Sequence, residues 1–391
     1  MIKSDPAKDI RLAWAEIDLS AVTHNIDLIR SLRTSSGTKI MAVVKADSYG
    51  HGAVDISRHA LKNGVDTLGV AFVEEGMQLR EAGIDAPIYI LGECSSSAAE
   101  QAIENSLILT VNSIDSARSY SIIAKKKGFK ASININIDTG MHRLGINWKD
   151  VQSVPVIKAF GYLKIEGIFS HFSCASEEDP AFTKKQINRF SSVMKKLESS
   201  GISFSNVHIA NSAAFFRFKG LYFNMVRTGI SIYGLSPYGK GWDIWLPEKA
   251  RKDIKGLRPV LSLKSRITFI KNVVKGEPIS YCGTFRTKRD SVIATIPVGY
   301  GDGYSRMLSN RSKVLIKGME APVVGNVTMD YFMVDITDIS GKNEINVGDE
   351  VVLIGKSGLK SITVEDIASI LGTINYEVTC MLKPRIPRIC I

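Results

Sequence analysis

Short apolar runs alternate with amphipathic stretches between Lys39 and Tyr233. Apolar runs of about four to eight residues are typical of strands buried on both faces, and apolar residues at helical spacing are typical of helices. The predicted strands lie at residues 40–44, 67–72, 88–91, 107–111, 132–137, 165–169, 206–209 and 225–232. The predicted helices lie at residues 53–63, 74–82, 97–105, 114–127 and 183–199. This alternation favours a (β/α)8 barrel, with an open doubly wound sheet as the alternative.

The pattern changes after Gly234, where β-branched runs are separated by turns rich in Gly, Asn and Asp. Such runs are typical of strands in a small β domain. They lie at residues 261–274, 291–298, 313–316, 321–324, 331–336 and 350–354, and one helix is predicted at 364–371 after a cap at Thr363 or Ser361. We therefore predict a barrel domain over residues 1–244 and a mostly β domain over residues 245–391.

The composition is that of a folded globular protein, with 45% hydrophobic and 23% charged residues. The net charge is +11, but the basic residues are scattered and form no nucleic-acid-reading motif, so we expect small anionic ligands instead. The five cysteines form no CxxC pair and no metal-ligand spacing, which favours a reducing compartment. The sequence has neither an apolar run of membrane-spanning length nor a signal-peptide core. We expect a cytoplasmic protein.

Lys45 ends the first apolar run and is followed by a glycine-punctuated loop that extends to Gly52. A lysine at the end of a buried strand loses hydration, which lowers its pKa and makes the free amine available as a nucleophile or proton carrier. The local pattern alone also allows a lysine whose amine simply reaches solvent.

Polar residues also follow the other predicted barrel strands, at the end where barrel enzymes carry their chemistry. These residues are Tyr49, residues 138–143, Ser170, His171, Asn211, Ser212 and residues 227–230. Ser212, Gly229 and Ile230 suit a phosphate, although Asn211 and Ser212 also suit a helix cap. A reactive lysine facing a phosphate site predicts pyridoxal 5′-phosphate, with the sugar phosphates of Schiff-base aldolases as the alternative.

Arg227 distinguishes between pyridoxal phosphate chemistries if it lies beneath the pyridine ring. An arginine disfavours protonation of the ring nitrogen and so weakens the electron sink, which favours removal and return of the α-proton. A salt bridge at the barrel rim is the alternative role. Racemisation also needs an acid–base group on the opposite face, and Tyr281 offers one if a neighbouring cation or histidine lowers its pKa. A packed aromatic is the alternative for Tyr281.

Six segments of the chain resemble bacterial alanine racemases. They are residues 42–52, 138–145, 208–212, 226–234, 298–303 and 375–378, so the resemblance runs along nearly the whole chain. It implies a pyridoxal 5′-phosphate enzyme that interconverts L- and D-alanine and supplies D-alanine for peptidoglycan. It also implies a head-to-tail homodimer in which Tyr281 enters the barrel of the partner.

The resemblance assigns roles to individual residues. Lys45 is implied as the Schiff-base lysine and as the base on one face of the substrate, and Tyr281 as the base on the other face. The implied ligands of the cofactor phosphate are Tyr49, Ser212, Gly229, Ile230 and Tyr376. Arg227 is implied at the pyridine nitrogen with His171 holding it, Arg143 and the backbone of Met329 at the substrate carboxylate, and Tyr300 at the entrance.

The chain departs from the family pattern at Asn136, where many relatives carry a lysine whose carbamate supports the arginine. A neutral amide supplies hydrogen bonds but no negative charge, and we expect Asn136, with or without a bound chloride, to orient Arg143. His142 and Thr328 are further departures that tune the size of the pocket. The remaining alternatives are a serine or broad-range racemase, a decarboxylase of related fold, and a pyridoxal-phosphate-binding protein without turnover.

Overall fold

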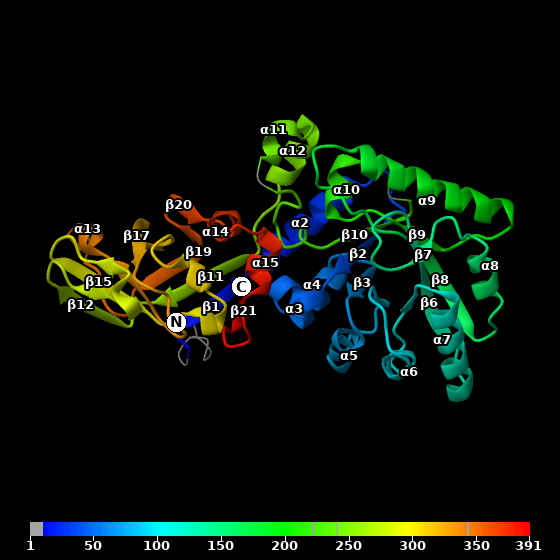
Figure 1. Cartoon of the computed structure of the whole chain (residues 1–391), viewed down its shortest axis with the longest axis horizontal. Helices are drawn as coiled ribbons and strands as arrows, with labels where there is room; N and C mark the ends of the chain where they lie inside the picture. Colours follow the sequence, from blue (N-terminus) through cyan, green and yellow to red (C-terminus); the bar gives the residue numbers. More distant parts are fainter. Residues whose placement is uncertain (1–10, 221–222, 240, 342–343) are drawn as a thin grey trace. The chain divides into compact units, whose positions relative to one another are not determined.

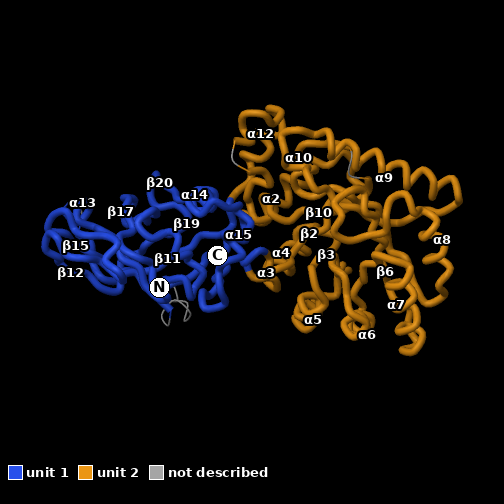
Figure 2. Tube along the Cα trace, viewed as in Figure 1, with its two compact units in different colours: residues 1–20, 49–51, 259–391 blue, residues 21–48, 52–258 orange. Residues whose placement is uncertain are grey.

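The computed structural model describes residues 11–220, 223–239, 241–341 and 344–391 (Figure 1). The chain divides into two compact units (Figure 2). Unit 1 contains the described part of residues 1–20 together with residues 49–51 and 259–391, and unit 2 contains residues 21–48 and 52–258. The change from unit 2 to unit 1 thus falls at residues 258 and 259, whereas the sequence placed the domain boundary at residues 244 and 245.

Unit 2 is built on eight parallel strands, and each of the predicted barrel strands is present. They are β2 (Lys39–Val43), β3 (Thr67–Val70), β4 (Ile88–Ile90), β5 (Leu109–Val111), β6 (Ala131–Asp138), β8 (Leu163–Phe169), β9 (Asn206–His208) and β10 (Met225–Thr228). Their order is β4-β3-β2-β10-β9-β8-β6-β5, and the short β7 (Ile146–Asn147) pairs with β6. A parallel bridge between Tyr89 and Ile108 joins the two edges. The predicted (β/α)8 barrel is therefore confirmed.

The five helices predicted from apolar periodicity are also confirmed, and they flank the barrel strands (Figure 1). They are α4 (Ala53–Lys62), α5 (Val73–Glu81), α6 (Ser96–Glu104), α7 (Ile114–Lys127) and α9 (Ala181–Ser199). Helix α7 shows why the pattern was readable: Ser113 caps its first turn, three lysines occupy its last turn, and Gly128 ends it in the left-handed region at φ 76°. The unit also contains α8 (Ser153–Lys158), α10 (Ser212–Arg217), α11 (Trp242–Trp245) and α12 (Glu248–Lys255), most of α2 (Leu19–Ser31) and the first part of α3 (Lys45–Gly50).

Unit 1 is mostly β, as predicted. Its strands are β1 (Ala13–Ile17), β11 (Leu261–Arg266), β12 (Phe269–Val273), β15 (Ser291–Ile296), β16 (Lys313–Ile316), β17 (Met319–Val324), β18 (Phe332–Asp335), β19 (Glu350–Ser357), β20 (Lys360–Ile362) and β21 (Arg388–Cys390). The sheet order is β12-β15-β18-β17-β16-β19-β11-β1-β21, with β20 paired to β19. A separate pair, β13 (Pro278–Ile279) and β14 (Phe285–Arg286), flanks Tyr281.

Several details of unit 1 differ from the sequence prediction, and the short strands β13, β14, β20 and β21 were not predicted. The run at 261–274 is two strands, because the chain leaves β11 and re-enters the sheet as β12 against β15. Strand β1 was missed, since its partners β11 and β21 lie at the far end of the chain. Helix α14 (Val364–Leu371) begins after Thr363 as predicted, but α13 (Thr337–Ser340) and α15 (Asn375–Cys380) are additional helices.

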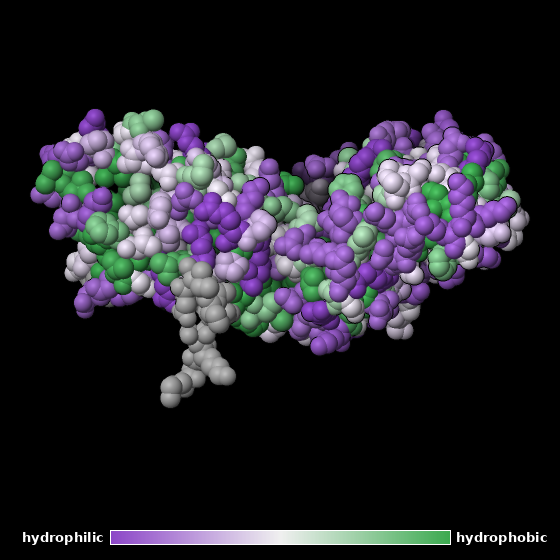
Figure 3. Space-filling view, turned by 90° about the horizontal axis from the view of Figure 1, so that it is seen from below, coloured by the Kyte–Doolittle hydropathy of each residue, from purple (hydrophilic) through white to green (hydrophobic). Residues whose placement is uncertain are grey.

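Figure 3 shows hydrophilic and hydrophobic residues mixed on the surfaces of both units. Large exposed side chains of unit 1 include Tyr281, Met307, Met329 and Tyr331. Among the described residues, no helix is both long enough and apolar enough to span a membrane.

Candidate functional site

The predicted residues of the barrel come from five neighbouring strands. Lys45 follows β2, Arg227 lies on β10, Ser212 follows β9, His171 follows β8, and Arg143 follows β6. Because parallel strands end on the same rim, these side chains share one end of the barrel. Burial lowers the pKa of His171 well below its usual value, and the charges of Arg227, Arg143 and Lys45 lower it further.

Lys45 begins a left-handed turn. Residues 46–49 have φ values between 51° and 54°, and Gly50 has a φ of 83°. Left-handed geometry costs roughly 1–2 kcal/mol for each residue with a side chain, so this turn stores strain. Hydrogen bonds hold it, from the N–H of Ser48 to the carbonyl of Val44 at 2.9 Å and from the N–H of Ala53 to Asp47 Oδ1 at 2.7 Å. The rigid turn fixes the backbone from which the Lys45 amine projects.

Glu75 ties this turn to the next strand end. One carboxylate oxygen accepts the N–H of Ala46 at 2.6 Å, and the other accepts the N–H of Ala71 at 2.7 Å and that of Phe72 at 3.2 Å. Glu75 was not predicted as a site residue from the sequence. Its signal was local, an acidic residue in the first turn of α5, where a carboxylate caps backbone N–H groups.

Arg227 is a buried cation with neutral partners. It is 3% exposed and donates to Nδ1 of His171 at 2.8 Å, Nδ1 of His208 at 2.5 Å, and the carbonyls of Ser170 and Ile209. Burial lowers the pKa of Arg227 to about 9, and the charge of Arg143 adds to this effect. Among the described residues no carboxylate pairs with Arg227. A buried positive charge without a counter-charge favours an electron-rich ligand beside it.

The protonation of both histidines follows from these contacts. Arginine only donates, so Nδ1 of His171 and of His208 must accept, and each neutral ring carries its proton on Nε2. The pKa of His208 is also lowered well below its usual value, mainly by burial and then by Arg227. The amide of Asn134 lies 3.2 Å from Nε2 of His208. The atom of the amide that faces Nε2 is Nδ2, so Oδ1 accepts the Nε2 proton only when the amide is turned by about 180°.

The residues predicted to bind phosphate in the barrel lie together. Ser212 Oγ accepts the N–H of Gly229 at 3.1 Å, and both Ser212 and Ile230 are buried. Strand β10 ends at Thr228, earlier than the predicted strand end at residue 232, because the chain turns at Gly229. Asn211 caps α10 by accepting the N–H of Ala214 at 3.0 Å, which leaves Ser212 free of the capping role.

Tyr49 and Tyr376 belong to unit 1, and their ring centroids lie 6.0 Å apart. A Cβ at Gly50 would collide with the carbonyl of Thr379, so a glycine is required where this loop packs on α15. Burial raises the pKa of Tyr376 well above its usual value. Its phenol is therefore neutral at physiological pH and can donate a hydrogen bond to an anion.

Tyr281 is not a packed aromatic, because its side chain is 73% exposed. It lies in a strained turn in which Ser280 has φ 64° and ψ −175° and Cys282 has φ 63°. Asn326 holds the turn: its Nδ2 donates to the carbonyl of Tyr281 at 2.8 Å, and its own carbonyl accepts the hydroxyl of Ser280 at 2.7 Å. A strained and exposed tyrosine is typical of a functional position.

Tyr300 and Met329 lie in adjoining loops of unit 1. The N–H of Tyr300 donates to the carbonyl of Thr328 at 3.0 Å, and the N–H of Gly301 donates to the carbonyl of Met329 at 2.9 Å. The side chains of Tyr300 and Met329 are 42% and 52% exposed. Both residues therefore present surface to a neighbouring molecule or ligand.

Asn136 is buried and takes part in a chain of polar contacts. Its Nδ2 donates to Oδ1 of Asn112 at 2.8 Å, and Nδ2 of Asn112 donates to the carboxylate of Glu93. A carboxylate only accepts, so Glu93 fixes the orientation of both amides. The Oδ1 atom of Asn136 is thereby directed away from Asn112. Glu93 and Asn112 were not predicted from the sequence, because they follow different strands, β4 and β5, from the strand that carries Asn136.

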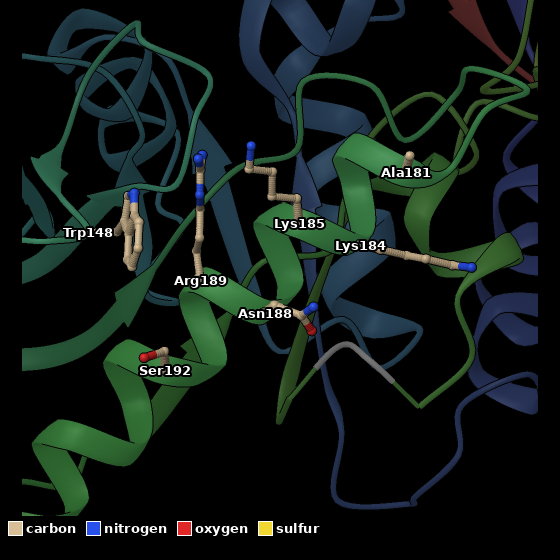
Figure 4. A pocket seen from close by; sticks show the side chains of 7 residues that line it. All are labelled: Trp148, Ala181, Lys184, Lys185, Asn188, Arg189 and Ser192. Carbon is tan, nitrogen blue, oxygen red and sulfur yellow. The ribbon is translucent and has the colours of Figure 1, made fainter.

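A cavity of about 500 Å³ lies outside this constellation (Figure 4). Its lining residues come from α9 and from Trp148, and none of the predicted site residues is among them. Arg189 lies over the ring of Trp148, with its guanidinium carbon 5.2 Å from the ring centre. The candidate site is therefore the rim of strand ends rather than this cavity.

Comparison with known proteins gives a consistent result. The model of the alanine racemase N-terminal domain matches residues 17–237, and that of the alanine racemase C-terminal domain matches residues 260–390. An alanine racemase of Methanococcus maripaludis is 42% identical, with 96% of this chain and 98% of the relative covered. An alanine racemase of Clostridium tetani is also 42% identical, with 98% of this chain and 96% of the relative covered.

Solved structures of alanine racemases also resemble this chain. Alanine racemase of Clostridium difficile 630 superposes with a TM-score of 0.89 at 40% identity, covering 97% of this chain and 96% of that one. The structure of the Bacillus anthracis enzyme, described with bound L-Ala-P, gives a TM-score of 0.88 at 38% identity, covering 97% of this chain and 95% of that one.

Proposed function

The chain belongs to the alanine racemase family of isomerases, and from this premise we propose that it racemises alanine by a two-base mechanism in which Lys45 and Tyr281 face opposite sides of the substrate. The supporting observation is the buried Arg227 guanidinium with its neutral partners on the same rim as Lys45. The product D-alanine serves peptidoglycan synthesis. The five free cysteines suit the reducing cytoplasm.

The family depends on pyridoxal phosphate, and the residues present fit that group. When bound, it supplies a carbonyl that links to an amine and a conjugated ring that withdraws electrons from the α-carbon. Arg227 offers a positive donor for the ring nitrogen and has no carboxylate partner among the described residues. Ser212, the backbone at Gly229 and Ile230, and the hydroxyls of Tyr49 and Tyr376 would hold the phosphate.

In the proposed mechanism, each residue binds or moves a proton at a defined place. The Lys45 amine would hold the cofactor, and it would take or return the α-proton on one face of the substrate. Tyr281 would do the same on the other face. His171 remains neutral because burial and three positive charges lower its pKa. Arg143 and the N–H of Met329 bind the substrate carboxylate, and Tyr300 lines the entrance.

We propose a homodimer in which Tyr281 completes the site of the partner. The exposed side chains of unit 1 support this: Tyr281, Met307, Met329 and Tyr331 are between 47% and 73% exposed. Hydrogen bonds link their loops, for example from the N–H of Val327 to Ser309 Oγ at 2.9 Å. Exposed apolar groups on fixed loops are typical of a surface that another subunit covers.

Asn136 is proposed to orient Arg143 through its Oδ1 atom. Replacing Asn136 with alanine is expected to raise the KM for alanine about tenfold with a smaller change in kcat, since one hydrogen bond to a charged group is lost. Steady-state kinetics measure this. Glu93→Gln should raise KM less, because it keeps the hydrogen bond but no longer fixes the amide orientation. An unchanged KM in Asn136→Ala, or an acidic side chain found on Arg143 in an alanine complex, would contradict the role.

The proposal is tested by incubating the purified protein with L-alanine in deuterium oxide, followed by chiral analysis. We expect D-alanine that carries deuterium at the α-carbon. Absorbance at about 420 nm checks that pyridoxal phosphate is attached. Absorbance without exchange would point to another amino acid or to a carrier without turnover, and a panel that includes serine would separate these. Release of carbon dioxide would indicate a decarboxylase.

A further inference from the structure

We propose that Gln186 is a positioning residue for racemisation, holding the loop of Arg143 and the backbone of His171 in one arrangement. This inference rests on the roles proposed above for those two residues. Gln186 lies on α9, is fully buried, and contacts the backbone of His171 and the side chain of Thr139. It therefore acts through other residues.

The side-chain amide of Gln186 is fully used in hydrogen bonds. Its Nε2 donates to the carbonyl of His171 at 3.0 Å and to Oγ1 of Thr139 at 3.2 Å. Its Oε1 accepts the N–H of Ser173 at 3.1 Å and the hydroxyl of Ser173 at 3.2 Å. One amide thus joins the segment after β6 to the segment after β8.

Thr139 links Gln186 to the segment that contains Ser170 and to the loop that leads to Arg143. Its hydroxyl lies 2.8 Å from that of Ser170, whose carbonyl accepts from Arg227 at 2.8 Å. Arg189, one turn after Gln186 on α9, donates to the carbonyl of Thr139 at 2.7 Å (Figure 4 shows Arg189 between Trp148 and Lys185). Helix α9 therefore forms hydrogen bonds with both the side chain and the backbone of Thr139.

The position of Thr139 affects that of Arg143, because hydrogen bonds hold the backbone between them. Oδ1 of Asp138 accepts the N–H groups of Gly140, Met141 and His142 at 2.8, 3.0 and 3.1 Å. These three hydrogen bonds hold the backbone of residues 140–142, which directly precede Arg143. A shift of about 1 Å at a substrate-positioning group can cost about 10²-fold in rate, so the anchor at Thr139 affects turnover.

Glutamate at position 186 gives a chemical test of the role. It has nearly the same shape, but an ionised carboxylate cannot donate to the carbonyl of His171, whereas a protonated one can. Burial raises the pKa of a carboxyl group, so the protonated fraction grows as the pH falls from about 9 to about 6. We expect kcat/KM of Gln186→Glu to be about 10- to 100-fold below wild type at the higher pH. The ratio to wild type should recover at least about threefold at the lower pH.

Thr183→Val provides the matched control. Thr183 lies one turn before Gln186 on the same helix, is fully buried, and its hydroxyl has no hydrogen-bond partner. This variant should keep kcat/KM within about twofold of wild type at every pH. Measurements use holoenzyme, with the absorbance of bound pyridoxal phosphate confirming equal loading of all variants.

Two results would overturn the inference. One is a Gln186→Glu enzyme with wild-type kinetics, and the other is a loss whose ratio to wild type does not change with pH. If that variant fails to fold, Thr139→Val replaces it, and unchanged kcat and KM there would equally overturn the role. Failure of the proposed function is recognised separately, because wild-type enzyme would then not racemise alanine at any pH.

Discussion

Replacing Lys45 with alanine is expected to lower the rate of alanine racemisation by at least about 10³-fold. The lysine would serve both as the covalent anchor of the cofactor and as one of the two bases, and a positioned base alone contributes about 10²–10⁴-fold. Its backbone lies at the start of a strained left-handed turn, which fixes the position of the side chain. The measurement is the deuterium exchange assay, run with equal amounts of folded protein.

Lys39→Met is the control for this variant. Lys39 lies at the opposite end of the same strand, β2, and donates to Asn206 Oδ1 at 2.8 Å. The Lys39→Met protein should be somewhat less stable but should retain its rate constants once folded, because Lys39 is remote from the rim. Wild-type exchange in Lys45→Ala would remove Lys45 from the mechanism.

The barrel could be predicted from the sequence because its signals are local. A strand buried on both faces has to be a short apolar run, and a helix on its outer side has to repeat its apolar residues with the helical period. The strand ends then placed Lys45, His171 and Arg227 on one rim without any knowledge of distances. In the structure, Lys45 follows β2, His171 follows β8 and Arg227 lies on β10.

Features that depend on distant parts of the chain could not be predicted in this way. Strand β1 was missed because its partner β11 lies about 250 residues later, so no local pattern marks the pairing. The polar contacts around Asn136 were missed for the same reason, since Glu93 and Asn112 follow β4 and β5. Gln186 lies on a helix whose apolar period was read correctly, but periodicity does not tell which buried polar residue bridges two loops.

The exposure of Tyr281 was likewise beyond sequence reasoning, which weighed a packed aromatic against a catalytic base. Its turn is strained at Ser280 and Cys282 and held by Asn326, a residue that follows β17. In the structure the ring of Tyr281 is exposed and is not packed within unit 1. The role of the ring in catalysis remains a proposal, and it leads to the second large effect.

Replacing Tyr281 with phenylalanine is expected to lower racemisation by about 10²–10⁴-fold while the cofactor remains bound, because only the acid–base hydroxyl is removed. The α-deuterium isotope effect should rise for one enantiomer, the one from which Tyr281 takes the proton. A structural defect would change both directions alike. Cys282→Ala, in the same turn, is the control and should retain activity, since the exposed thiol has no assigned role.

Mixing the Lys45→Ala and Tyr281→Phe proteins tests whether the tyrosine serves the partner subunit. In a hybrid dimer with shared sites, one site receives an intact lysine from one chain and an intact tyrosine from the other, and the second site receives neither. Random exchange makes half of the dimers hybrid, so about a quarter of wild-type activity should return. If Tyr281 acted within its own chain, no hybrid site would be complete. Activity that stays at the level of the single variants, with exchange confirmed by differently tagged chains, would therefore contradict the proposed dimer.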